Sequence, residues 1–304
     1  MTRRQPRAFI SHAHSDHSAR HAHTLCSAAT AELLRARFRA RGGSFEELSF
    51  GQAYEWGGVR LKMYPAGHCL GSAMLHVEDD GRTLLYTGDF KLQPSLTAGA
   101  AEVVPCNVLV MECTFGNSAY RLPPREEVVC KLIELVQATL RGGRTPVIQA
   151  YALGKAQEVT AILTRAGIPV RQHRDVYELS RIYERFGVTL GDYAPMDDAD
   201  LPGCALVVPP RRKRVALPAG RQVTTIGVSG WAAVPGTRRW LRADHALPLS
   251  DHADFDELLE MVERVEPSEV YCTHGPESFV DELRQRGVVA YPLEEARRVG
   301  MAGR

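Results

Sequence analysis

Six consecutive residues near the start of the chain, His12-Ala13-His14-Ser15-Asp16-His17, place three imidazoles and a carboxylate in one short segment. The residues before them, 6–11, are typical of a short buried strand. On an extended segment His12 and His14 project to the same side, and the turn that follows can direct Asp16 and His17 toward a second point. Imidazole and carboxylate groups bind Zn, Mn or Fe, so this density of ligands predicts two adjacent metal centres. The alternative is a polar loop of solvated histidines.

Three further polar residues follow predicted strands. His68 comes after a strand that ends at Tyr64, Asp89 after a strand over 83–86, and His274 after a strand over 269–273. Sites in α/β proteins form where strands leave a sheet. Each residue alone would be an ordinary loop residue, but together with the histidine cluster they become candidate ligands.

The remaining pattern is that of an α/β protein. It predicts a helix over 18–39, hairpin turns at Gly57-Gly58 and Asp79-Asp80-Gly81, and a central strand over 108–111. A strand–helix–strand unit over 146–150, 155–165 and 169–172 implies a parallel sheet. We also expect helices over 123–141, 255–265 and 276–286, and strands over 205–208 and 223–228.

These residues resemble the metallo-β-lactamase superfamily, in which H-x-H-x-D-H precedes a single His, a bridging Asp and a last His. Glu112 in Met111-Glu112-Cys113-Thr114 matches motif A of its β-CASP nucleases, His252 in Ser250-Asp251-His252 matches motif B, and His274 matches motif C. The segment Tyr151 to Glu158, YALGKAQE, is similar to one found in the SNM1-like and bacterial ligase-associated exonucleases.

The resemblance implies a metallo-β-lactamase αββα sandwich with an inserted α/β β-CASP domain. The stretch between Glu112 and His252 is far longer than a loop requires, which agrees with an insertion. We expect the metallo-β-lactamase domain to comprise 1–119 and 249–304, and the β-CASP nucleic-acid-clamping domain to comprise 120–248. The histidine cluster begins closer to the first residue than is usual in such proteins, so we expect the first sheet to lack edge strands.

The resemblance also assigns roles. His12, His14 and His68 would hold one divalent ion, Zn or Mn; Asp16, His17 and His274 would hold a second; and Asp89 would bridge them. Two metals would activate a water as the nucleophile. His252 would protonate the leaving 3′ oxygen and Glu112 would orient it, with Asp16 counted among the catalytic residues. The alternatives are a capping or salt-bridging carboxylate for Glu112 and a structural histidine for His252. Asp251 is either a neighbour of the ligands or a cap for the next helix.

Positive charge must be local if the chain binds nucleic acid, because 37 Lys and Arg nearly balance 36 Asp and Glu. The densest basic run is Arg211-Arg212-Lys213-Arg214, for which a solvated face is the alternative. Tyr151 and Lys155 are further candidate contacts, because a lysine at a helix start can hold a terminal phosphate. This placement favours digestion from the 5′ end. We expect Trp231 to pack in a core, with base stacking as its alternative.

The function that these features predict is a metal-dependent exonuclease of bacterial DNA repair, acting on single-stranded DNA and leaving 5′-phosphate and 3′-hydroxyl ends. A DNA ligase or helicase of the same pathway is the expected partner. The alternatives are a β-CASP ribonuclease of RNA processing and a non-catalytic nucleic-acid-binding subunit. A lactamase or thioester hydrolase would need neither the insertion nor Glu112 and His252. Seven cysteines without a C-x-x-C pair, and no apolar run long enough for a bilayer, predict a cytoplasmic protein with reduced thiols and no membrane partner.

Overall fold

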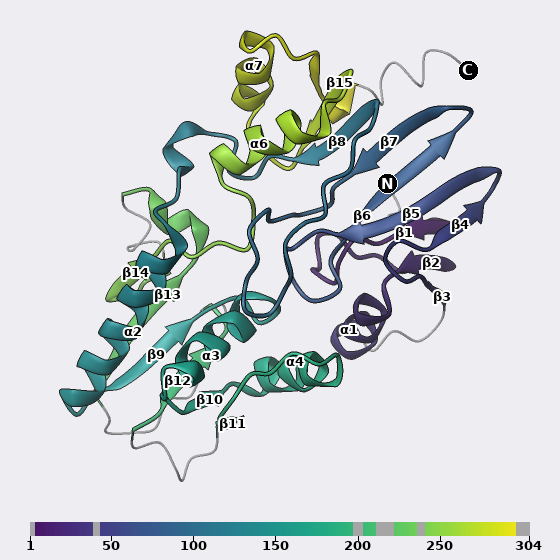
Figure 1. The fold of residues 1–304 in the computed structure, drawn as a ribbon. Coiled ribbons are helices and arrows are strands. Elements are labelled where there is room, and N and C mark those ends of the chain that lie inside the picture. Colours follow the sequence, from purple (N-terminus) through teal and green to yellow (C-terminus); the bar gives the residue numbers. More distant parts are fainter. Residues whose placement is uncertain (1–3, 39–42, 197–202, 211–221, 236–240, 296–304) are drawn as a thin grey trace. The chain divides into compact units, whose positions relative to one another are not determined.

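The computed structural model describes residues 4–38, 43–196, 203–210, 222–235 and 241–295 (Figure 1). The chain divides into two compact units. Unit 1 is formed by Met1–Pro94, Ala98–Ser118 and His252–Arg304, and unit 2 by Ser95–Thr97 and Ala119–Asp251. Unit 1 is therefore built from segments that lie far apart in the sequence.

The main sheet of unit 1 is mixed and has seven strands. Their order is β16 (Ala290–Pro292), β15 (Glu269–Thr273), β8 (Val108–Glu112), β7 (Arg82–Tyr86), β6 (Ala73–Asp79), β5 (Val59–Pro65) and β4 (Ala53–Trp56). The strands from β16 to β7 are parallel, and those from β7 to β4 are antiparallel. Because β6 separates β5 from β7, strands β5, β7, β8 and β15 all run in the same direction. Their carboxyl ends therefore share one edge of the sheet.

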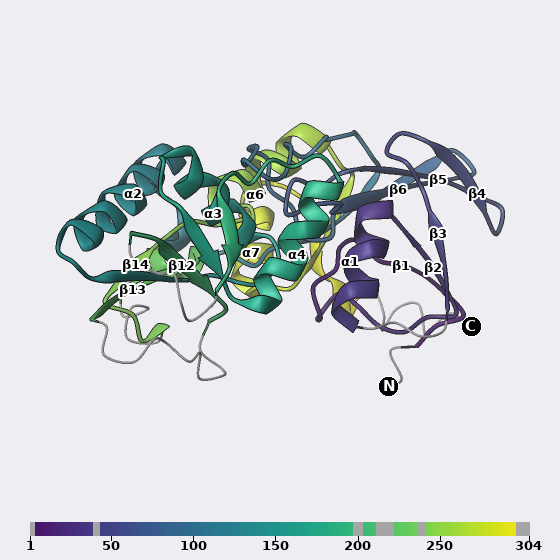
Figure 2. The ribbon, with the colours of Figure 1, turned by 90° about the horizontal axis from the view of Figure 1, so that it is seen from below.

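A second, parallel sheet and three helices complete unit 1. The sheet has the order β1 (Arg7–Phe9), β2 (His23–Cys26) and β3 (Ser44–Glu47), and the helices are α1 (Ala28–Phe38), α6 (Phe255–Val265) and α7 (Glu277–Gln285). Buried residues of α6 and α7 pack on the seven-stranded sheet, and Leu25, Leu61 and Met63 lie in the core between the sheets. Helix α1 lies against the short sheet (Figure 2). The layers follow the predicted αββα order.

The helix predicted over 18–39 is wrong in its first part. Residues His23–Cys26 form strand β2, which pairs with β1 on one side and β3 on the other. Thr24, Leu25 and Cys26 are buried. Parallel pairing with two strands outweighs the helical pattern of the local sequence, and the helix begins only at Ala28.

Unit 2 contains a six-stranded parallel sheet. Its order is β11 (Tyr193–Pro195), β10 (Val170–Gln172), β12 (Ala205–Val208), β9 (Thr145–Gln149), β13 (Val223–Val228) and β14 (His245–Leu247). The helices are α2 (Arg125–Arg141), α3 (Lys155–Arg165) and α4 (Arg174–Arg185), and the 3-10 turns are η1 (Ser118–Tyr120) and η2 (Gly230–Ala233). Apolar residues of α2 and α3 form one core with β9, β12 and β13.

The predicted strand–helix–strand unit is present as β9, α3 and β10, and the sheet is parallel, as expected. Strand β12 lies between β9 and β10, so the two predicted strands are not neighbours. Both hairpins form at their predicted turns, where Gly57, Gly58 and Gly81 have positive φ. Within the described ranges, every helix is too short or too polar to cross a bilayer.

Candidate metal centre

The candidate ligands of unit 1 lie at strand ends that share one edge of the seven-stranded sheet. His68 follows β5, Asp89 follows β7, and His274 follows β15 directly. His12 and His14 come just after β1 of the short sheet. The common direction of β5, β7 and β15 is therefore what brings side chains from distant parts of the sequence to one place.

One group of four potential ligands contains His12, His14, His68 and Asp89. His14 Nδ1 lies 3.0 Å from His68 Nε2, and His12 Nε2 lies 3.3 Å from Asp89 Oδ2. Two ligand atoms bound tetrahedrally to one zinc ion are about 3.4 Å apart. The spacing of these atoms is thus close to that of ligands around a common centre.

A second group contains His17, Asp89 and His274. His17 Nε2 lies 3.2 Å from Asp89 Oδ1, and the rings of His17 and His274 are 4.7 Å apart. Asp89 belongs to both groups, and it directs a different carboxylate oxygen toward each. His274 has a φ of 58°, a left-handed conformation that is uncommon for a residue with a side chain.

Polar atoms at the centre of the two groups are buried without a hydrogen-bond partner. Within the described part of the chain these include His12 Nε2, His17 Nε2 and Asp89 Oδ1. A buried polar atom that makes no hydrogen bond is costly, and such atoms need an explanation. Three of them converging from imidazoles and a carboxylate fit a metal ion, since these are the donors that Zn and Mn take in proteins.

The charge states of the cluster also suit a metal. Burial, followed by the neighbouring imidazoles of His68 and His14, lowers the pKa of His12 well below its usual value, so the ring is held in the neutral form that coordinates metals. Burial and the nearby Glu112 carboxylate raise the pKa of Asp89 to about 6. A cation between these groups would favour the ionised carboxylate.

Asp16 is the one predicted ligand outside both groups. Its side chain is 69% exposed, and its Oδ2 lies 3.9 Å from His17 Nε2. The structure places it beside the second group without bringing it into contact with Asp89 or His274. Its assignment as a ligand and catalytic residue therefore remains a prediction.

The loop that carries His68 is shaped by glycine and serine. Gly67 has a φ of 76°, and a Cβ there would lie 2.2 Å from the carbonyl oxygen of Lys91. Ser72 Oγ accepts hydrogen bonds from the backbone N–H groups of His68, at 3.1 Å, and of Cys69, at 3.2 Å. A small residue and a side-chain acceptor thus fix the turn that directs His68 into the cluster.

Glu112 and His252 form a hydrogen-bonded pair next to the cluster. Glu112 is buried at the end of β8, and His252 Nδ1 lies 3.0 Å from each of its carboxylate oxygens. Glu112 also accepts from Phe90 N at 2.9 Å and from Thr114 Oγ1 at 2.5 Å. Burial alone would raise the pKa of Glu112, but the charge of His252 and these hydrogen bonds lower it to about 2.

The sequence does not predict two hydrogen-bond partners of Glu112, Thr114 and the amide of Phe90. Thr114 lies two residues after Glu112 and could have been suspected from that proximity. The amide of Phe90 could not, because a backbone N–H carries no sequence signal. Glu112 does not cap a helix, since it ends a strand, is 1% exposed and accepts from Phe90 and Thr114; its pairing is with His252.

The predicted nucleic-acid contacts in unit 2 have different outcomes. Tyr151 is 47% exposed. Lys155 is only 1% exposed, and its ammonium is paired with Glu158 and Asp251, so the predicted capture of a terminal phosphate has no accessible charge to perform it. Trp231 is 37% exposed, which corrects the expectation that it packs in a core. The run from Arg211 to Arg214 lies outside the described residues.

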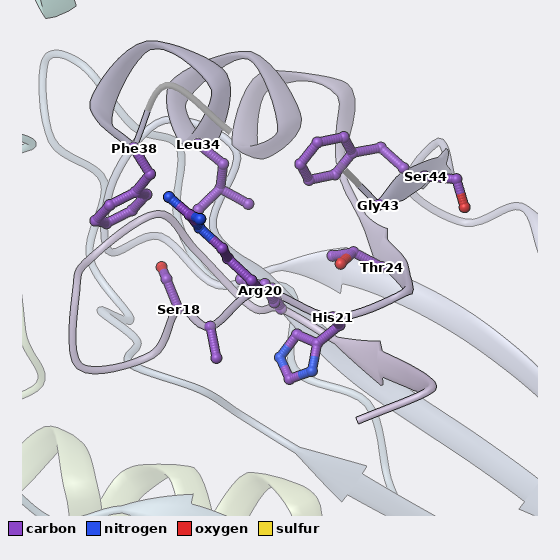
Figure 3. A pocket seen from close by; sticks show the side chains of 11 residues that line it. Ser18, Arg20, His21, Thr24, Leu34, Phe38, Gly43 and Ser44 are labelled. Atoms are coloured by element: carbon purple, nitrogen blue, oxygen red, sulfur yellow. The ribbon is translucent and has the colours of Figure 1, made fainter. Parts of the chain in front are cut away.

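A cavity of about 180 Å³ lies elsewhere in unit 1, beside α1 (Figure 3). Ser18, Arg20 and His21, from the segment after the histidine cluster, line it together with Leu34 and Phe38 of α1. The residues around it include none of the candidate ligands. This cavity is therefore separate from the metal centre.

Residues 242–294, which include His252 and His274, match the family described as a Zn-dependent metallo-hydrolase RNA specificity domain. A probable DNA ligase of Opitutus terrae is 38% identical over 298 residues, covering 96% of this chain and 29% of the relative. The DNA cross-link repair protein SNM1 of Arabidopsis thaliana is 25% identical over 297 residues, covering 87% of this chain and 60% of that protein. This chain thus spans less than two thirds of either relative.

Other similarities are more local or concern the fold alone. The endoribonuclease YSH1 of Saccharomyces cerevisiae is 36% identical over 121 residues, which cover 39% of this chain and 15% of that protein. The crystal structure of a protein of unknown function from Enterococcus faecalis superposes with a TM-score of 0.63 at 14% identity, covering 89% of this chain and 76% of the other. The fold is therefore shared well beyond the range of sequence similarity.

Proposed function

Because this chain belongs to the metallo-β-lactamase superfamily and to its β-CASP group, we propose that it is a metal-dependent exonuclease that hydrolyses phosphodiester bonds in single-stranded DNA. The observation that carries the proposal is Asp89, which directs one carboxylate oxygen toward each of two histidine groups beside the Glu112–His252 pair. Paired ion sites can stabilise the attacking and leaving oxygens of a phosphodiester, and a separate proton donor can protonate the leaving oxygen.

We assign two divalent ions, Zn or Mn, to the cluster. His12, His14 and His68 would hold the first, His17 and His274 the second, and Asp89 both; Asp16 would join the second set only after its exposed side chain turned inward. When bound, such ions supply positive charge for the phosphate oxygens and make a water more acidic. The number of ions is a proposal that metal analysis can test.

The chain's own residues supply proton transfer and orientation. Glu112 engages His252 Nδ1, so Nε2 lies on the opposite side of the ring, and this is the nitrogen we assign to protonate the leaving 3′ oxygen. Glu112, whose pKa is lowered to about 2, is ionised, and its carboxylate accepts from Nδ1 and so orients the ring. The products would carry 5′-phosphate and 3′-hydroxyl ends.

DNA is favoured as the substrate by the extent of the similarities. The relatives named as a DNA ligase and a DNA cross-link repair protein match nearly the whole chain, whereas the endoribonuclease matches 39% of it. The alternative, a ribonuclease, is supported by the name of the family that matches residues 242–294. The relation to a ligase supports a repair pathway in which a ligase acts on the same strand.

We propose residues 120–248 as the nucleic-acid-clamping domain, with contacts at one sheet edge of unit 2. Tyr151 follows β9 and Trp231 follows β13, and these strands are parallel neighbours, so both exposed rings lie at the carboxyl edge. The Tyr120 ring meets Trp231 edge-on at 5.3 Å, which fixes the indole. Unpaired bases can stack on such rings without sequence preference.

Lys155 does not support digestion from the 5′ end, because its ammonium is buried and ion-paired and so is not available to a terminal phosphate. Digestion from the 5′ end is retained as a proposal on family resemblance alone. The deciding experiment offers end-labelled single-stranded DNA and RNA of one sequence to the purified protein with Mn or Zn. Preferential cleavage of DNA that is lost in His252→Ala supports the proposal, and preferential cleavage of RNA favours the ribonuclease. No cleavage of either strand under any metal would overturn both.

A further inference from the structure

Four charged side chains of unit 2, two of them buried and two partly buried, form a cluster at the start of α3. Lys155 Nζ lies 2.9 Å from Glu158 Oε2 and 3.5 Å from Asp251 Oδ1, and Arg125 Nη2 lies 2.6 Å from Glu158 Oε1. Lys155 and Glu158 are 1% and 3% exposed. Two cations and two carboxylates make the cluster formally neutral. We call Arg125, Lys155, Glu158 and Asp251 the Lys155 ion cluster.

The position of Lys155 is unfavourable by two separate criteria. A buried ammonium loses its hydration, and it is retained only with well-placed partners. Lys155 is also the first residue of α3, where the helix dipole disfavours a cation. An apolar residue of similar length would avoid both costs. Departures from local preference of this kind are expected where a residue serves function more than stability.

The helix start around Lys155 is tightly fixed. Gly154 adopts a φ of 87°, and its N–H donates to Gln157 Oε1 at 2.8 Å. Gln157 is completely buried and donates to Ala152 O at 3.0 Å and Ser180 Oγ at 3.2 Å. The Lys155 ammonium therefore extends from a rigid base, which allows it to fix the position of whatever it pairs with.

One of its partners, Asp251, directly precedes His252 in the chain. Asp251 does not cap the following helix: Asp254 does, accepting from Asp256 N at 3.1 Å and Glu257 N at 3.0 Å. After His252, Ala253 N donates to Phe90 O at 2.7 Å. His252 is thus flanked by an ion pair on one side and a backbone hydrogen bond on the other, while Glu112 holds its ring.

We propose that Lys155 is a positioning residue for His252, acting through its ion pair with Asp251. Fixing the Asp251 carboxylate limits the backbone freedom of the next residue, so the imidazole keeps the orientation that Glu112 requires. In this proposal Lys155 positions a residue of the site and does not bind the terminal phosphate that the sequence predicts for it. The kinetic part of the inference rests on the proposed nuclease function.

The first test compares Lys155→Met, which keeps the length of the side chain and removes its charge, with Lys155→Arg, which retains the charge. We expect Lys155→Met to lower kcat roughly 10- to 100-fold, the usual cost of losing an outer partner of a site residue. KM and metal content should be unchanged, and Lys155→Arg should recover most of the activity. Lys131→Met is the matched control, because Lys131 lies on α2 with an exposed partner, Glu134. A wild-type kcat in Lys155→Met would overturn the proposal.

Asp251→Asn provides the second test, and it leaves the Lys155–Glu158 pair intact if Lys155→Met fails to fold. We expect a similar loss of kcat in Asp251→Asn. The double variant Lys155→Met/Asp251→Asn should be no worse than the poorer single variant, because both changes remove one interaction. Losses that multiply would show that the two residues act separately, against the proposal.

A readout without catalysis separates this inference from the proposed function. The proton shared by His252 Nδ1 and Glu112 should give a downfield NMR resonance that is absent in His252→Ala. We expect Lys155→Met and Asp251→Asn to weaken or shift it, and Lys131→Met to leave it unchanged. If the wild-type protein cleaves no nucleic acid, the proposed function fails while this measurement still tests the positioning. A resonance unchanged in both cluster variants would refute the positioning even in an active enzyme.

Discussion

His252 Nδ1 lies 3.0 Å from both carboxylate oxygens of Glu112, a buried acid that also accepts hydrogen bonds from Thr114 and from the Phe90 amide. Phe90 in turn accepts the N–H of Ala253 through its carbonyl. The residue after Asp89 therefore links the acid and the backbone that follows the imidazole. This arrangement holds a histidine beside the ligand cluster. His252 is in neither of the two groups described above, but its ring, Asp89 and Glu112 form a further group of potential ligands.

We predict that His252→Ala retains metal and loses activity by about 10²-fold or more, the usual scale for a lost general acid. The measurements are metal content and kcat on single-stranded DNA. His76→Ala is the control, since His76 lies within β6 and away from the strand ends that carry the ligands. Loss of metal from His252→Ala would make this residue a ligand and remove its assignment as an acid.

We predict that Asp89→Ala abolishes activity and lowers bound metal to one ion per chain or none. The reason is the position of its two oxygens, which lie 3.3 Å from His12 Nε2 and 3.2 Å from His17 Nε2. Metal analysis of the purified variant checks the result. A variant with two ions and wild-type turnover would contradict the bridging assignment.

We predict that Asp89→Asn is more stable than the wild type without metal and less stable than the wild type with metal. Without metal, the folded-state pKa of Asp89 is raised from 3.8 to about 6. A pKa that is higher in the folded state stabilises the fold at pH values below the unfolded-state pKa. This contribution is lost as pH rises through about 6. The metal-free variant should therefore be the more stable protein above pH 6, by a margin that shrinks as pH falls toward 4. With Zn added, the wild type should be the more stable.

Thermal unfolding of both proteins in chelator and in Zn, at pH values above and below 6, checks this prediction. Two results would contradict it: a metal-free variant that is less stable than the wild type above pH 6, or equal stabilisation of both proteins by Zn.

Replacing Arg211, Arg212, Lys213 and Arg214 by Ala should weaken DNA binding and flatten its dependence on salt, without changing metal content. Each phosphate contact removed should reduce the log–log salt slope by roughly 0.7 for a single strand. Binding titrations at several salt concentrations measure the slope. An unchanged slope would leave this run as an ordinary solvated face.

Sequence reasoning predicts best where local chemistry decides the structure. The hairpins at Gly57-Gly58 and Asp79-Asp80-Gly81 follow from turn residues, and β8 and β9 follow from short apolar runs. It fails where pairing is distant. The local sequence pattern assigns β2 to a helix, and the position of β12 between β9 and β10 has no local signal. Helix α4 does carry a local signal, because the buried residues Val176, Leu179 and Tyr183 have helical spacing.

In the candidate site, too, some residues have a local sequence signal and others depend on distant contacts. His68, Asp89 and His274 could be located because polar residues at strand ends are conspicuous. The burial of Lys155 has no local signal, because it depends on two carboxylate partners, and one of them, Asp251, lies far along the chain. A helix-start lysine looks the same in sequence whether it meets solvent or a buried acid.

The left-handed backbone of His274 sets two evolutionary pressures against each other. At a φ of 58° glycine is more stable than histidine by about 1 kcal/mol, whereas the imidazole can serve as a ligand. A descendant of this chain released from its chemistry would gain stability by drifting to glycine at this position. A histidine that persists at this position in a lineage would thus indicate continued selection for metal binding. A glycine in its place would mark a relative that keeps the fold and has lost the reaction.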